Sequence, residues 1–117
     1  LSYTTFSYDS LGCEVTGPAQ VRVSVTVSNT GSRDGDEVVQ IYVTDPLAST
    51  VRPRLQLRAF ERVFVESGGS RTVEFTLGED AFALYDIDMR KVVEPGEFII
   101  QAGPSSDNIL LSQTITL

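Results

Sequence analysis

Histidine and tryptophan are absent from this chain of 117 residues, and cysteine and methionine each occur once. Without histidine and with one thiol, the chain cannot build a zinc site of the Cys/His type. Ser-His-Asp and Cys-His catalytic triads in their usual form are excluded for the same reason. Cys13 has no second cysteine with which to form an internal disulfide. We therefore expect no cofactor.

Basic charge and long apolar runs are also scarce. The chain has 9 basic and 16 acidic residues, so its net charge is −7. A nucleic-acid partner is excluded on this ground, because phosphate binding needs a concentrated basic surface. No apolar run approaches the ~18 residues of a membrane span, and no signal-peptide pattern is visible. One free cysteine fits a reducing or an oxidising compartment alike, so a cytoplasmic, periplasmic or secreted location is compatible with the sequence.

Strand patterns fill most of the chain. Between residues 21 and 28 four valines alternate with polar residues, the period-two pattern of a half-buried strand. Further strands are expected at 3–8, 37–44, 55–65 (as one or two), 71–77, 91–93, 97–102 and 109–117, with a helical turn at 79–84. Seven to nine short strands separated by turn residues predict an all-β antiparallel sandwich of the immunoglobulin type. The length fits a single domain, 1–117, and the missing initiator Met suggests a piece trimmed from a longer product.

The alternation also predicts which side chains point inward. Val39, Ile41 and Val43 share one face of their strand. In the segment 55–65 we expect Leu55, Leu57 and Phe60 to point inward.

Acidic residues could supply chemistry, since a glycosidase needs two carboxylates flanking a sugar. Those that attract attention stand at predicted turns, where acids are usually solvated: Asp34, Asp36, Glu37, Asp86 and Asp88. The run 34–37 could alternatively donate oxygens to Ca²⁺, but it lacks the full pattern of a calcium loop. A free-standing hydrolase is therefore the weaker hypothesis.

A basic cluster stands out between residues 45 and 62. Arg52, Arg54, Arg58 and Arg62 are four of the nine basic residues, and they lie within 11 positions. The cluster is either a solvated loop and strand edge or a docking surface whose guanidinium groups pair with a neighbour's carboxylates or carbonyls.

Aromatic side chains could form a sugar-stacking platform, although tryptophan is missing. The candidates are Tyr3, Phe6, Tyr8, Tyr42, Phe60 and Tyr85, and core packing is the simpler role for several of them. Cys13 is most simply a small, half-buried residue, because no histidine and no nearby base activates it.

Several motifs in order suggest a family. They are Val-Thr-Val-Ser-Asn-Thr-Gly at 25–31, Gly-Asp-Glu-Val-Val-Gln-Ile-Tyr-Val at 35–43, Arg52-Pro53, Leu-Arg-Ala-Phe-Glu-Arg-Val at 57–63, and Val-Val-Glu-Pro-Gly-Glu-Phe at 92–98. With them the chain resembles, over nearly its whole length, the C-terminal fibronectin type III-like domain of glycoside hydrolase family 3, which contains β-glucosidases and β-xylosidases.

The resemblance implies a non-catalytic structural module that is not an enzyme by itself. In such enzymes the nucleophile and the acid/base lie in preceding domains of the same polypeptide, which would be the partners of this module. The stretch 45–62 would lie against them, with Arg52, Pro53, Leu57, Phe60 and Arg62 as the docking interface. The alternative is a carbohydrate-binding module that holds polysaccharide near the active site.

Overall fold

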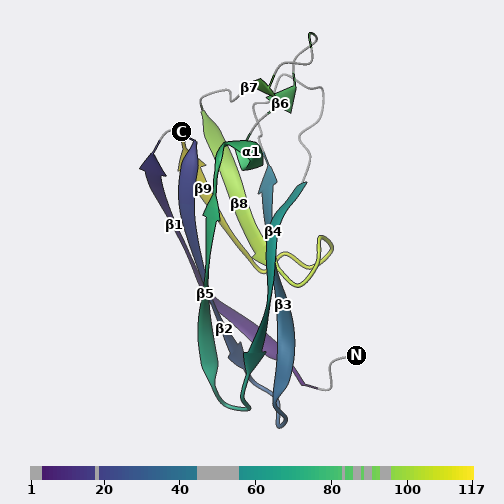
Figure 1. Cartoon of the computed structure of the whole chain (residues 1–117). Coiled ribbons are helices and arrows are strands. Elements are labelled where there is room, and N and C mark those ends of the chain that lie inside the picture. The colour runs from purple at the N-terminus through teal and green to yellow at the C-terminus, as the bar shows by residue number, and fades with distance from the viewer. Residues whose placement is uncertain are drawn as a thin grey trace.

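Two antiparallel sheets pack face to face in the computed structural model, which describes residues 4–17, 19–44, 56–82, 84–85, 88, 91–92 and 96–117 (Figure 1). The first sheet has the order β1-β2-β5, formed by β1 (Phe6–Gly17), β2 (Gln20–Asn29) and β5 (Ser70–Leu77). The second has the order β4-β3-β8-β9, formed by β4 (Gln56–Val65), β3 (Gly35–Thr44), β8 (Glu97–Gly103) and β9 (Leu111–Thr116). This arrangement confirms the predicted β-sandwich.

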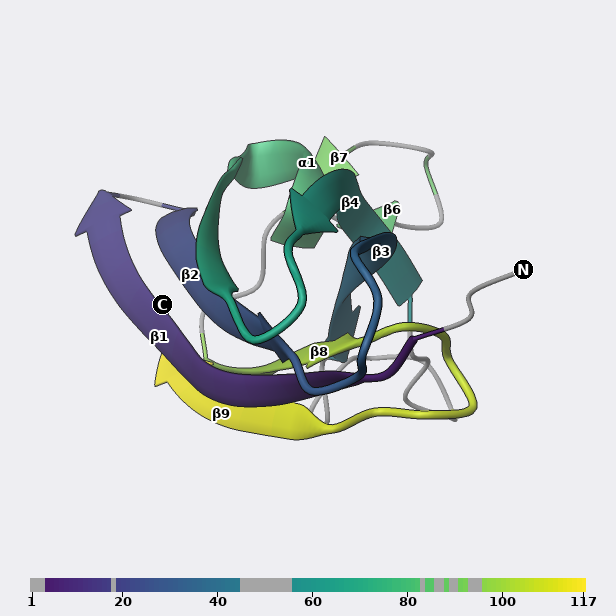
Figure 2. The ribbon, with the colours of Figure 1, turned by 90° about the horizontal axis from the view of Figure 1, so that it is seen from below.

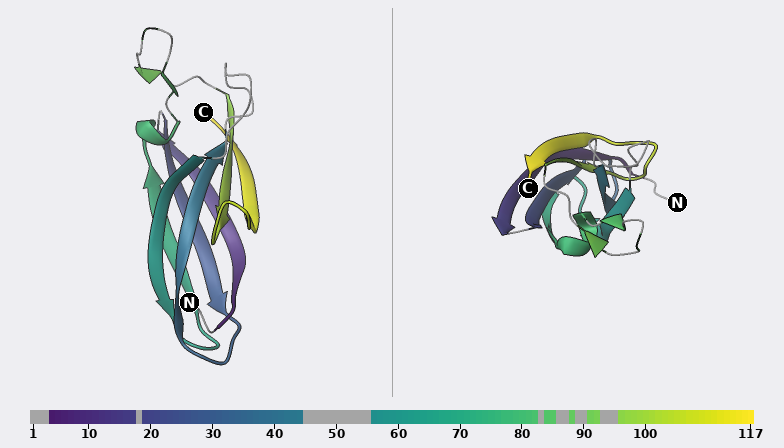
Figure 3. Two further views of the ribbon diagram at one scale, coloured as in Figure 1. Left: turned by 90° about the vertical axis from the view of Figure 1, so that its right-hand side faces the viewer. Right: turned by 90° about the horizontal axis from the view of Figure 1, so that it is seen from above.

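A short helical turn, α1 (Glu79–Phe82), and a small ladder of β6 (Leu84–Tyr85) with β7 (Lys91–Val92) follow β5. Figure 3 shows both at the same end of the sandwich as the C-terminus. In the described part of the chain, no helix is long and apolar enough to cross a membrane.

The core lies between the sheets and comes from the alternating strand positions. From β2 it takes four valines with no exposed surface, and from β3 it takes the three residues expected to share one face. Phe82 of α1 closes one end of the core, with its ring edge-to-face against Phe98 at a centroid distance of 5.0 Å. The central members are Val21, Val23, Val25, Val27, Val39, Ile41, Val43, Val73, Phe75, Leu77, Phe98 and Ile100.

The strand β1 is longer than the sequence predicts, because it continues to Gly17. Asp9 lies outside the register with β2, so the strand carries a bulge. The bulge moves the inward positions from Tyr8 to Leu11 and Cys13, from even to odd numbers. A strand whose parity changes in the middle does not show the simple alternation that identifies β2.

A buried asparagine closes the end of the sandwich opposite α1. Asn29 is only 2% exposed, and its side-chain amide donates to the carbonyl oxygens of Arg33 at 2.7 Å and Val65 at 2.9 Å. Its Oδ1 accepts from the hydroxyl of Thr4 at 2.7 Å and from the N–H of Gly31 at 3.0 Å. Because β2 and β4 belong to different sheets, this one side chain ties the two layers together.

The loop after β2 requires glycine for close packing. A Cβ on Gly31 would lie 1.9 Å from the hydroxyl oxygen of Thr4 and 2.8 Å from the backbone nitrogen of Thr5. Gly68, in the neighbouring turn between β4 and β5, has a φ of +76°, which L side chains rarely adopt. The N–H of Gly68 donates to the carbonyl of Asn29, so the two turns support each other.

Candidate docking surface

The outward-facing side of β3 and β4 carries a group of exposed apolar residues, which we call the β3–β4 outer face. Phe60 is 66% exposed, Phe64 48%, Leu57 46% and Val38 36%. The register places Phe60 opposite Gln40, and Leu57 opposite Tyr42. Successive rungs on one face of a sheet lie about 7 Å apart, so these side chains follow one another along the same face of the strand pair, with polar residues among them.

The expectation that Leu57 and Phe60 point inward is wrong, and Leu55 lies outside the described residues. A bulge explains the outcome for the first two. Ala59 pairs with Ile41 and Leu57 pairs with Tyr42, so Arg58 is an extra residue in β4. The bulge changes the parity of the strand, and an odd-numbered and an even-numbered residue therefore reach the same outer face.

An ion pair lies in the middle of the β3–β4 outer face. Both Nε and Nη2 of Arg62 contact Oδ2 of Asp36 at 2.8 Å. The side chains are 73% and 36% exposed, so the pair is a surface salt bridge and contributes little to folding. It places a fixed positive and negative group between Phe60 and Phe64, which gives the apolar strip a polar centre.

The basic cluster is therefore divided. Arg52, Pro53 and Arg54 lie outside the described residues. Arg62 is on the outer face, whereas Arg58, at the bulge, lines a pocket on the other side of β4.

Of the five residues expected at a docking interface, the structure describes Leu57, Phe60 and Arg62 and brings all three to one face of β4. Sequence reasoning missed Phe64 and Val38, which belong to the same face. The signal was present, because Phe60, Arg62 and Phe64 occur at every second position. This alternation is out of phase with Ala59, Val63 and Val65, which pack on the core or belong to it.

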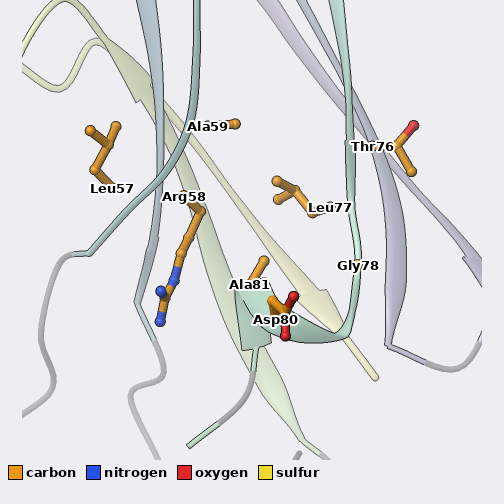
Figure 4. Close-up of a pocket in the computed structure, with 8 residues that line it drawn as sticks. All are labelled: Leu57, Arg58, Ala59, Thr76, Leu77, Gly78, Asp80 and Ala81. Carbon is orange, nitrogen blue, oxygen red and sulfur yellow. The ribbon is translucent and has the colours of Figure 1, made fainter.

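The pocket beside Arg58 lies where the edges of the two sheets meet, between β4 and β5 and next to α1 (Figure 4). The views in Figures 1 and 2 show these two edge strands on the same side of the sandwich. The cavity has a volume of about 240 Å³, and its apolar lining includes Leu57, Ala59, Leu77 and Ala81.

Three acidic residues expected together at a turn have separate roles instead. Asp34 accepts a hydrogen bond from the N–H of Ser67 at 2.8 Å, and Asp36 pairs with Arg62. Glu37 accepts from the Tyr8 hydroxyl at 3.2 Å. Asp36 lies within β3, so its placement at a turn was wrong, whereas Glu37 belongs to the strand expected at 37–44. The calcium hypothesis for 34–37 loses its basis, because these carboxylates point to different partners.

Among the described residues, no three or more potential metal ligands lie close enough together to hold a metal ion. Asp88 stands at an exposed turn, as the sequence suggests, and Asp86 lies outside the described residues.

The contact between Tyr8 and Glu37 bridges the two sheets. Burial raises the pKa of the half-buried Glu37 carboxyl, against the smaller opposing effect of its hydrogen bond with Tyr8. Burial, together with the nearby Glu37 charge, also raises the pKa of the Tyr8 phenol well above its usual value. The pair is therefore a structural contact in which the phenol keeps its proton.

The remaining candidates are mostly packing residues. Burial raises the pKa of the Cys13 thiol to about 11, so this half-buried thiol stays protonated at neutral pH, as the sequence suggested for an unreactive residue. Tyr8 and Tyr42 are buried and Phe6 is half-buried against the core. Tyr3 is not described, and nor is the side chain of Tyr85, so Phe60 alone of the proposed platform is seen exposed.

Comparison with known proteins identifies the domain. The family model for the fibronectin type III-like domain matches residues 37–106. Thermostable β-glucosidase B from Acetivibrio thermocellus is 41% identical over 119 residues, covering 98% of this chain and 16% of the relative. A β-xylosidase from Formosa agariphila is 46% identical over 109 residues, covering 91% of this chain and 15% of the relative.

Solved structures agree with the sequence relatives. The family 3 β-glucosidase from Bifidobacterium adolescentis matches with a TM-score of 0.93 and 37% identity, over 100% of this chain and 18% of its own. A β-glucosidase from Erythrobacter marinus matches with a TM-score of 0.90 and 43% identity, over 100% of this chain and 16% of its own. The chain thus corresponds to one part of such glycosidases and not to a whole enzyme, as the resemblance implied. It belongs to the fibronectin type III-like domain family, in the form that glycoside hydrolases of family 3 carry.

Proposed function

We propose that residues 1–117 are a single non-catalytic module of a larger β-glucosidase-like glycoside hydrolase, where they pack against the catalytic domains and stabilise them. The observation that carries the proposal is the β3–β4 outer face, where Phe60 is 66% exposed beside three other exposed apolar residues. An apolar patch of this kind on a small domain marks an interaction surface. The relatives supply a candidate partner, because the chain spans only 16% of the length of the first of them.

Docking would act through the β3–β4 outer face together with Arg52 and Pro53, which precede it in the chain. Burying a phenylalanine or leucine side chain stabilises an assembly by about 1.5–3 kcal/mol. The ion pair of Arg62 with Asp36 would lie within the interface and fix its orientation more than its affinity. The catalytic body would contact the module only when the module is folded. The stability of the module would therefore be coupled to that of the catalytic body.

The first experiment is to measure the intact mass of the natural polypeptide that carries this sequence. A product several times larger than 12.8 kDa, with this segment near its C-terminus, is the expected result. A natural product of about 12.8 kDa would overturn the proposal, since no catalytic body would then be attached.

Docking itself is tested by substitutions in the whole polypeptide. Leu57→Asp and Arg52→Ala are expected to lower its melting temperature while the hydrolysis of aryl glycosides continues. The matched control is Thr72→Asp, an exposed position on the outer face of β5 in the other sheet. Unchanged melting in both docking variants would contradict the packing role.

The alternative function is carbohydrate binding, and one observation favours it. Phe60 and Phe64 stand exposed on the same face of one strand, where aromatic rings could stack on sugars. Retention of the chain on cellulose or xylan, abolished by Phe60→Ala, would favour this function over packing. Loss of melting temperature in Leu57→Asp without any retention on polysaccharide would favour packing.

A further inference from the structure

The pocket between β4 and β5 is lined by the guanidinium group of Arg58, and not all of its hydrogen-bond donors have an acceptor. Nη2 of Arg58 donates to the side-chain oxygen of Gln56, its neighbour on the same strand. The Nε of Arg58 is buried, and no acceptor among the described residues reaches it. A buried donor without an acceptor is unfavourable, so a partner that supplied an oxygen atom to this guanidinium group would be favoured.

The walls of the pocket favour a side chain with an apolar stem. Leu57, Ala59, Leu77 and Ala81 supply apolar surface to the pocket that Arg58 also lines. Asp80 also lines the pocket, and Figure 4 shows the Arg58 side chain running toward the α1 end, with the Asp80 carboxylate at the same level across the pocket.

We infer that this pocket is the polar anchor of the docking interface and binds an acidic side chain from the catalytic body of the same polypeptide. The inference rests on the proposed function and names the chemistry of the contact. Leu57 belongs both to the pocket and to the β3–β4 outer face, so the two surfaces are continuous. A carboxylate is the natural partner, because charge-assisted bonds to a guanidinium are the strongest that this group makes.

The length of the relatives supports this choice of partner. The chain covers 18% of the β-glucosidase structure from Bifidobacterium adolescentis, so a large body is available in such proteins to supply the contact. Within this chain, the basic cluster at 52–62 is a positive region in a molecule with a net charge of −7, which favours an acidic partner at this position.

The test uses Arg58→Met in the whole polypeptide, which keeps the aliphatic stem and removes the charged head. We expect the melting temperature to fall by a few degrees at low salt and by less than half as much in about 1 M NaCl, where charges are screened within ~3 Å. Arg58→Lys keeps the charge and should recover part of the loss. Arg71→Met, at an exposed arginine on the adjacent strand β5, is the control and should melt like the parent.

Arg58 could instead stabilise the domain itself, and melting the 117-residue chain with the same substitution distinguishes this role from docking. The chain alone should not lose stability, because among the described residues the guanidinium has a partner only in Gln56 on the same strand. An equal loss in the chain alone, a loss that salt does not reduce, or unchanged melting of the whole polypeptide would each overturn the inference. If Leu57→Asp lowers the melting temperature and Arg58→Met does not, docking stands and the acidic anchor fails.

Discussion

The outer faces of the two sheets differ in chemistry, although both cover the same core. On β2 and β5 the outward side chains are mostly hydroxyl-bearing, and they face one another in register: Ser28 with Ser70, Thr26 with Thr72, Ser24 with Glu74 and Arg22 with Thr76. Thr26 and Thr72 join their hydroxyls at 2.9 Å. On β3 and β4 the corresponding positions include four exposed apolar residues, Val38, Leu57, Phe60 and Phe64, alongside the polar Asp36, Gln40 and Arg62.

This difference separates folding from assembly. Both sheets contribute inner residues to the buried core, so the fold itself does not require an apolar group on either outer face. The first sheet follows that rule, and its hydroxyl groups suit a surface in contact with water. The second departs from it on two adjacent strands, and this departure is the basis of our proposal that the β3–β4 outer face packs against a partner.

The largest effect is expected from a comparison of two phenylalanines, one in the core of the sandwich and one on its outer face. Phe98→Ala should lower the free energy of unfolding by about 3–5 kcal/mol, because the side chain is 2% exposed and its loss leaves a cavity. Phe60→Ala should change it by less than about 0.5 kcal/mol, since the ring is 66% exposed. Urea unfolding of the 117-residue chain measures both. A loss in Phe60→Ala approaching that in Phe98→Ala would place this face in the core and remove the contrast.

A second test concerns the residue that ties the two sheets together without using either outer face. Asn29→Ala should lower the free energy of unfolding by about 2–3 kcal/mol, because the Val65 carbonyl loses a buried donor. Ser24→Ala, on the outer face of the same strand, is the control and should stay within about 0.5 kcal/mol. Equal urea midpoints for the two variants would show that the link is not needed.

The smallest effect is expected from a comparison of two neighbouring carboxylates, Glu37 and Asp36, which lie on opposite faces of β3. The pKa of Glu37 is raised in the folded state by burial, so its contribution to stability is fully present below its unfolded pKa of 4.5. That contribution is lost as the pH rises through the raised folded pKa. Glu37→Gln should therefore be more stable than the parent at pH 7, by less than about 1 kcal/mol for a half-exposed group.

The measurement is the difference in unfolding free energy between parent and variant from about pH 4 to pH 7, where the unfolded carboxyl titrates. The advantage of Glu37→Gln should shrink as the pH falls, while the Tyr8 hydroxyl can still donate to the amide oxygen. Asp36→Asn, on the outer face, is the control and removes only the surface pair with Arg62. A difference for Glu37→Gln that is constant with pH would contradict the assigned role of burial.

Simple alternation made most of the fold predictable. The four valines of β2 and the Val39, Ile41 and Val43 series of β3 all point inward as expected. Prediction failed where a bulge intervened, at Asp9 in β1 and Arg58 in β4. One extra residue reverses the side to which every later side chain points, and no local sequence pattern marked these two positions.

Some residues of the candidate site could be predicted from the sequence, but their arrangement in space could not. The sequence by itself determined that the chain forms a β-sandwich, because alternation of apolar and polar residues is a local property of each strand. It also identified Leu57, Phe60 and Arg62 as interface candidates through the family motif. Only the tertiary structure decided that these three share an exposed face with Val38 and Phe64, and that Arg58 lines the adjoining pocket between β4 and β5. The reason is physical: the pairing of β4 with β3, and the bulge within it, depend on contacts between residues far apart in the chain.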